Sequence, residues 1–169
     1  MEQLLILALI ASIVMGIQLA MRYVRSMRLR YWMGRGMDAY KSGHFDEAVR
    51  AFRKCVRITP GWLYARTLMS ICLAHGGDRD GAAREIKLIE ALQPREAETW
   101  ALISTFHALC ARENDEALLR AFEQLAALDA RAAFTLLEQP VFTQHRAAPR
   151  LSALRERIVA TGKAPVENS

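Results

Sequence analysis

One pattern of residues recurs along this chain at an offset of 34 positions. The stretch GHFDEAVRAFRKCVRITPG begins at Gly43, and GDRDGAAREIKLIEALQPR begins at Gly77. Three further pairs share the offset: Asp46 and Asp80, Ala48 and Ala82, Pro60 and Pro94. A period of this length predicts a stack of similar units, because one short unit cannot bury its apolar face alone.

Each unit is expected to form two helices. Phe52, Cys55 and Val56 recur at helical spacing and form one apolar stripe. Small residues are needed where two helix backbones cross closely, and Gly36 and Ala48 occupy those places. The sequence therefore predicts an all-α fold built from helix pairs.

Turns and helix ends are marked by glycine and proline. Gly43 permits a tight turn between the two helices, and Pro60 and Pro94 end their helices. The charged side chains of the first unit lie mostly off the apolar stripe, which indicates a solvated face: Asp46, Glu47, Arg50, Arg53, Lys54 and Arg57.

The repeat resembles the tetratricopeptide family. The first unit carries Trp32, Gly36, Gly43, Phe45, Ala48, Phe52, Val56 and Pro60, and the second carries Leu73, Gly77, Ala82, Ile86 and Pro94. A third begins at Trp100, continues through Phe122 and Asp129, and has Glu113–Asp115 in place of the glycine turn. The resemblance implies an array of about three repeats over residues 29–130.

The resemblance also implies a function. In this family the first helices line a concave groove that binds a protein partner. The matching positions here are Met33, Met37, Tyr40, Lys41, Tyr64, Thr67, Ile71, His75, Ala101 and Thr105. Met33 and Met37 stand where a clamp for chaperone tails needs Lys and Asn, so an apolar or helical peptide is the expected ligand. The alternative is that these residues contact the chain's own C-terminal helices.

After the array, residues 131–162 are expected to cap the stack with two helices, at about 131–138 and 149–160. Residues 163–169 are expected to be disordered.

The N-terminal segment is expected to be a transmembrane helix, residues 1–24. Residues 4–21 contain no charged side chain, and eighteen residues make about 27 Å of helix. A cleaved signal peptide is the alternative, but it would carry its positive charge before the apolar run. The arginines follow the run instead, which predicts a cytoplasmic C-terminal domain at a bacterial inner membrane.

A basic juxtamembrane segment, residues 25–35, leads from this helix into the first repeat. No proline interrupts it, so one continuous helix is expected. The candidate contacts to lipid headgroups are Arg22, Arg25, Arg28 and Arg30.

Motifs for chemistry are absent from the sequence. The three cysteines form no CxxC pair, and the four histidines form no HExxH motif, so no metal site is expected. The segment GMDAYKS has Tyr40 where a phosphate loop needs glycine. We therefore expect neither enzyme activity, nor a cofactor, nor nucleic-acid binding. The expected function is a membrane-anchored adaptor, and the alternative is an accessory subunit held in a membrane complex largely by its transmembrane helix.

Overall fold

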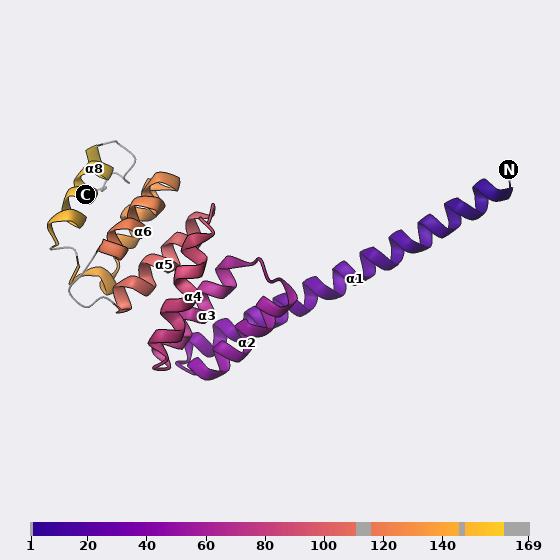
Figure 1. Ribbon diagram of the computed structural model, residues 1–169, viewed down its shortest axis with the longest axis horizontal. Helices are drawn as coiled ribbons and strands as arrows, with labels where there is room; N and C mark the ends of the chain where they lie inside the picture. The colour runs from indigo at the N-terminus through magenta and orange to yellow at the C-terminus, as the bar shows by residue number, and fades with distance from the viewer. Residues whose placement is uncertain (1, 111–115, 146–147, 161–169) are drawn as a thin grey trace, which may run out of the picture.

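The computed structural model describes residues 2–110, 116–145 and 148–160. These residues form eight α-helices and one short 3-10 helix, and no strand occurs among them (Figure 1). The helices are α1 (Glu2–Lys41), α2 (Phe45–Ile58), α3 (Leu63–His75), α4 (Arg79–Ala91), α5 (Ala97–Cys110), α6 (Glu116–Leu128), α7 (Ala130–Leu137), η1 (Pro140–Phe142) and α8 (Pro149–Ala160).

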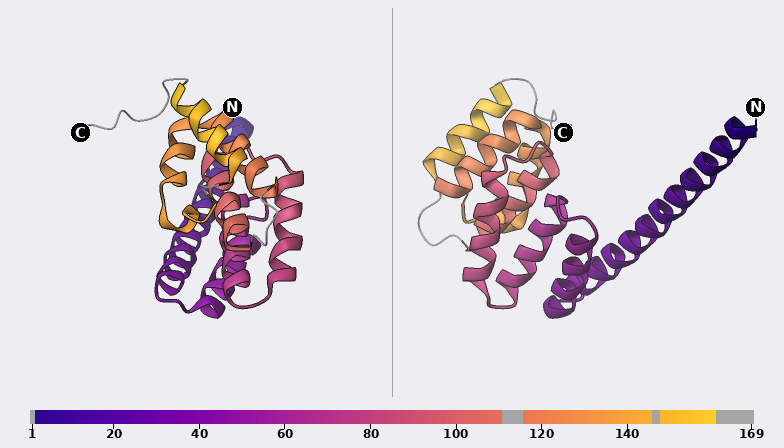
Figure 2. Two further views of the ribbon diagram at one scale, coloured as in Figure 1. Left: turned by 90° about the vertical axis from the view of Figure 1, so that its left-hand side faces the viewer. Right: turned by 45° about the vertical axis from the view of Figure 1, so that its right-hand side comes forward.

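Helix α1 has two parts with different surroundings. Its C-terminal part packs against α2, while its N-terminal half projects away from the other helices (Figure 1 and the right-hand view of Figure 2). The helix is continuous over 40 residues, as the lack of a proline predicts. Within the described residues, no helix combines the length and the apolar character needed to cross a membrane. The transmembrane helix expected over residues 1–24 is therefore not found.

The first two helix pairs are closed by the same turn. Gly43 and Gly77 have φ angles of +75° and +97°, a left-handed conformation that residues with a Cβ rarely adopt. The amide after each glycine donates to the carbonyl five residues earlier, over 2.9 Å at His44 and 3.0 Å at Asp78. This is the hydrogen bond of a Schellman helix end, and it recurs at the 34-residue offset.

Two groups of buried side chains hold the stack together. The first core cluster joins α1, α2 and α3 and consists of Ala39, Ala48, Val49, Phe52, Leu68, Met69 and Cys72. The second core cluster begins at Ile71 and continues through α4, α5, α6, α7, η1 and α8. Ala48 and Phe52 are fully buried, which agrees with the helix crossing predicted at Ala48 and the apolar stripe predicted through Phe52.

The C-terminal helices extend the second core cluster. Helices α7 and α8 and the 3-10 helix pack on α5 and α6, and the rings of Phe122 and Phe142 meet edge to face at 5.1 Å. The Asp129 carboxylate caps α7 by accepting from the Ala132 amide over 2.9 Å. These elements cover the end of the stack that lies farthest from α1 (Figure 1).

The predicted all-α fold with tetratricopeptide-like helix pairs is confirmed for the described residues. The altered turn predicted at Glu113–Asp115 and the disordered tail predicted at residues 163–169 lie outside them.

Candidate functional site

The candidate groove is formed by the first helix of each pair, which is the C-terminal part of α1, then α3 and α5. Met33, Met37 and Tyr64 are half-buried and pack against the first core cluster. Their inner atoms therefore contribute to stability, while their outer atoms are available to a partner. The structure brings these three predicted residues together on one cluster.

Tyr40 and His75 meet in a second group of predicted groove residues. The Phe45 ring stacks on His75 at 4.6 Å and meets Tyr40 edge to face at 6.1 Å. Burial raises the pKa of the Tyr40 hydroxyl, and the neighbouring Cys72 raises it further. Lys41 is exposed in the last turn of α1.

Two predicted groove residues do not reach the surface. Thr67 and Ile71 are 0% and 1% exposed, and the Thr67 hydroxyl donates to the Leu63 carbonyl over 2.9 Å. Helix α3 is apolar on nearly all sides, so the sequence alone does not show which side is covered. The prediction that Thr67 and Ile71 contact a partner is wrong for this arrangement, because both side chains fill the core.

The third helix pair carries the last two predicted groove residues on α5. Ala101 and Thr105 are half-buried, and the Thr105 hydroxyl donates to the Ala101 carbonyl over 2.9 Å. Leu102, which no sequence pattern indicated, is half-buried and packs against both core clusters. Because Ala101, Leu102 and Ile103 are all apolar, the sequence did not show which of these side chains is buried and which is partly exposed.

A hollow of about 390 Å³ lies beside Tyr64, between the start of α3 and the start of α5. It is lined by Gly61, Trp62, Leu63, Tyr64, Glu96, Glu98 and Thr99. The rings of Trp62 and Tyr64 stack at 6.3 Å, so the hollow has an aromatic wall. Trp62 was not among the predicted groove residues, although an aromatic residue directly after a Pro-Gly turn was a signal for it.

The arginines predicted to meet lipid headgroups differ in their surroundings. Arg25 donates to the Ile58 carbonyl and, over 3.4 Å, to the Thr59 hydroxyl, and so binds the C-terminal end of α2, where a cation is favoured. Arg22, Arg28 and Arg30 are exposed along α1.

The chemistry of the described residues offers no obvious reactive centre. No group of three or more His, Cys, Asp or Glu side chains in that part of the chain could hold a metal ion. Burial raises the pKa of all three cysteines, that of Cys72 to about 12, so their thiols are poor nucleophiles near neutral pH.

The geometry defines a stack of tetratricopeptide-like helix pairs with a surface along its first helices. Residues 29–62 match the sequence model of the family described as Tetratricopeptide repeat. The match covers the first helix pair, which carries more of the family's positions than either of the other two units.

Among solved structures, the chain is similar to one titled "Crystal structure of MamA protein", with a TM-score of 0.52 and 18% sequence identity. The similarity covers 81% of this chain and 74% of that chain. At this identity the likeness concerns the fold alone. No curated protein matches the chain.

Proposed function

We propose that this protein is a non-enzymatic adaptor that presents the groove along α1, α3 and α5 to a partner protein. The observation that carries the proposal is the position of Met33, Met37 and Tyr64, which rest on the first core cluster yet stay partly exposed. Methionine and aromatic side chains adapt to apolar or helical peptides. The protein fold that the helix pairs resemble generally serves protein binding, which supports the same proposal.

The C-terminal helices pack away from the part of the groove that Met37 and Tyr64 form on α1 and α3. They pack on α5 and α6 around the second core cluster, whereas Met37 and Tyr64 rest on the first. This arrangement favours partner binding over the alternative in which the chain fills its own groove.

The groove is tested by replacing Met37 and Tyr64 with Ala in the full chain. Proteins captured from a lysate by the wild type are identified by mass spectrometry, and their capture by the variant is compared. A loss of about 2 kcal/mol at contact residues would weaken binding about thirtyfold.

The matched control is Leu88→Ala on α4 with Leu92→Ala at the C-terminal cap of that helix, since these side chains are apolar and 55% and 61% exposed but lie outside the groove. It should capture partners as the wild type does, and thermal melting should show that both variants fold. Equal capture by the groove variant and the control would contradict the proposed site.

We further propose that the N-terminal half of α1 holds the protein in a bacterial inner membrane, with the helix pairs in the cytoplasm. Residues 4–21 contain no charge, and Leu9, Ile13 and Ile17 are 62%, 54% and 54% exposed on a helix that projects from the stack. Such a surface is costly in water. The exposed Arg22 would then lie at the anionic headgroups on the cytoplasmic side. Arg28 and Arg30 would lie beyond the headgroups but within about 8–10 Å of that charged surface, the distance over which salt screens its field.

Two reporters fused after Ser169 test the orientation. A reporter active only in the cytoplasm should be active, and one active only in the periplasm should be silent. Fractionation should place the chain with the membranes until residues 1–24 are removed. Periplasmic activity, or a full chain recovered without membranes, would contradict the proposal.

A second candidate function is that of an accessory subunit in a membrane complex, contacted mainly through α1. The row of exposed apolar side chains on α1 favours it. Removing residues 1–24 separates the two candidates in mild detergent. An adaptor keeps its partners after the deletion, whereas a subunit bound through α1 loses them.

A further inference from the structure

A basic hollow lies between α1 and α2, apart from the groove described above. Its volume is about 340 Å³, and it is lined by Trp32, Arg35, Glu47, Arg50, Ala51, Arg53, Lys54 and Arg57. Five of these side chains are cations and one is a carboxylate, an excess of four positive charges. The sequence analysis assigned the α2 members to a solvated face, but the structure places them around a concave surface.

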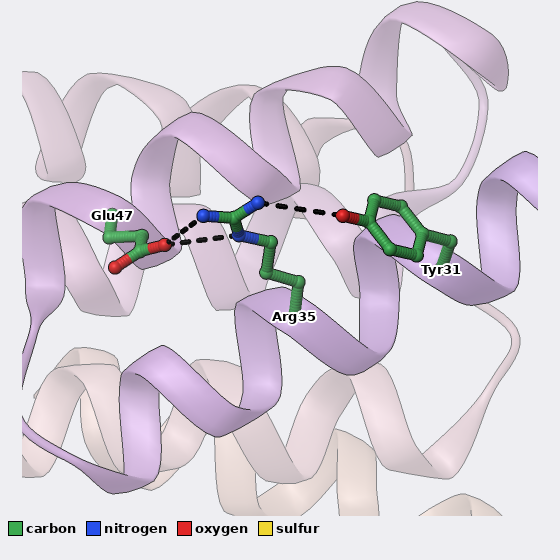
Figure 3. Close-up of polar contacts among 3 residues, drawn as sticks. All are labelled: Tyr31, Arg35 and Glu47. Atoms are coloured by element: carbon green, nitrogen blue, oxygen red, sulfur yellow. Dashed lines mark hydrogen bonds and ion pairs between the residues drawn. The ribbon is translucent and has the colours of Figure 1, made fainter.

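The single carboxylate of the hollow is already engaged. The Glu47 carboxylate accepts two hydrogen bonds from the Arg35 guanidinium, over 2.8 and 3.0 Å, and the same guanidinium donates to the Tyr31 hydroxyl over 3.5 Å (Figure 3). The hydrogen bonds with Arg35 lower the pKa of the Glu47 carboxyl and raise the pKa of Arg35. The charge of Glu47 is thus matched by Arg35, which leaves the other four cations as the excess.

Trp32 supplies the apolar part of the hollow. Its ring is half-buried, and the Lys54 ammonium lies over it at 3.6 Å from the ring centroid. This cation–π contact holds Lys54 near the other cations, although like charges repel. A ligand that brings negative charge would therefore relieve a repulsion that the fold already contains.

The spacing of the cations suits a short polypeptide. Arg50, Arg53 and Arg57 follow one side of α2 over about 10 Å, or two helical turns. Guanidinium groups bind carboxylates through two parallel hydrogen bonds. We propose that this hollow binds an acidic segment of a partner protein, with its carboxylates paired to these arginines and an apolar side chain against Trp32.

A nucleic acid fits this surface less well. Binding through a phosphate backbone commonly uses about six to ten cationic contacts along an extended face, whereas the excess here is four charges within one hollow.

A lipid bilayer also fits less well, and this step rests on the proposed anchor. Trp32 follows Met21 by 11 residues, which places it about 16 Å further along α1. The headgroup layer of one leaflet is only about 5–7 Å thick.

The test uses the full chain in mild detergent and a fluorescently labelled oligoglutamate peptide followed by anisotropy. Wild type should bind the peptide at about 50 mM salt and more weakly at about 150 mM, because exposed charges are screened. Arg53→Glu with Arg57→Glu should weaken binding by about tenfold or more. An oligoglutamine peptide should not bind.

The matched control is Arg84→Glu with Lys87→Glu on α4, which changes the charge equally at two exposed residues outside the hollow. It should weaken binding by about threefold or less, since only the long-range field changes. Arg53→Gln with Arg57→Gln gives an intermediate loss and serves if the charge reversal fails to fold. Groove variants at Met37 and Tyr64 should bind the peptide normally, which separates this site from the proposed adaptor groove.

Three results would overturn the proposal. One is equal weakening by the α2 and α4 variants, and another is no peptide binding by the wild type at low salt. The third is preference for another anion over the oligoglutamate peptide. This would be seen if an oligothymidylate of equal charge bound more tightly than the peptide, or if short-chain phosphatidylglycerol displaced the peptide when added at equal charge.

Discussion

The Phe52 ring lies directly against the backbone of Gly36, so closely that a Cβ built on Gly36 would be 2.6 Å from the ring carbon Cε1. Phe52 is fully buried in the first core cluster and cannot move aside without disturbing that packing. The crossing of α1 and α2 therefore depends on a residue without a side chain.

Gly36→Ala is expected to destabilise the fold. Alanine favours a helix over glycine by up to about 1 kcal/mol, but overpacking a core costs about 1–3 kcal/mol. Gly34→Ala is the control in the same helix, because nothing lies within 4 Å of its added Cβ. It should raise stability by up to about 1 kcal/mol. Urea unfolding of the two variants should give opposite signs; two equal shifts would contradict this packing.

Ala48→Glu is expected to unfold the first helix pair. Ala48 is 0% exposed, and a buried, unpaired carboxylate costs about 3 kcal/mol or more. Arg53→Glu introduces the same residue on the exposed side of α2 and should change the free energy of unfolding by about 0.5 kcal/mol at most. Circular-dichroism melting checks both, and similar melting would show that the register of α2 is wrong.

The pair of Arg35 and Glu47 should stabilise the protein only above acidic pH. Hydrogen bonds with Arg35 lower the pKa of Glu47 in the folded state below its ordinary value of 4.5. The contribution is therefore fully present above that value and is lost as the pH falls through the lowered pKa. The melting difference between wild type and Glu47→Gln should shrink on acidification. In an Arg35→Gln background the same substitution should show a much smaller dependence, since only the weaker effects of Arg50 and His44 on the pKa of Glu47 remain. An undiminished dependence would show that Arg35 is not the main partner.

The cysteines should react in an order set by burial. Cys55 and Cys72 are 0% exposed, and burial raises the pKa of Cys72 to about 12. Cys110 is half-buried, and Arg79 partly opposes the upward effect of burial on its pKa. Iodoacetamide at pH 8 should modify Cys110 first and reach the other two only on unfolding. Peptide mass spectrometry gives the order, and early modification of Cys72 would contradict the buried position of α3.

The sequence predicted the helix pairs because local chemistry determines them. Gly43 and Gly77 adopt a left-handed conformation that lets the first helix of a pair end sharply. Two glycines 34 residues apart therefore indicate the turns between the two helices of two successive pairs. The apolar stripe of α2 likewise identified Phe52 as buried, and the small side chain of Ala48 indicated a close helix crossing, before any neighbour was known. Both signals lie within one helix pair.

The tertiary structure decided which side of each remaining helix is covered. Thr67 and Ile71 were expected in the groove but fill the core, while Leu102 was not expected and packs against both core clusters. Helices α3 and α5 are contacted from several sides, so periodicity cannot distinguish a covered side from an open one. The basic residues of α2 surround a hollow only because α1 brings Trp32 and Arg35 beside them. Residues far apart in sequence share a surface only after the helices pack, and that contact has no signature in either helix alone.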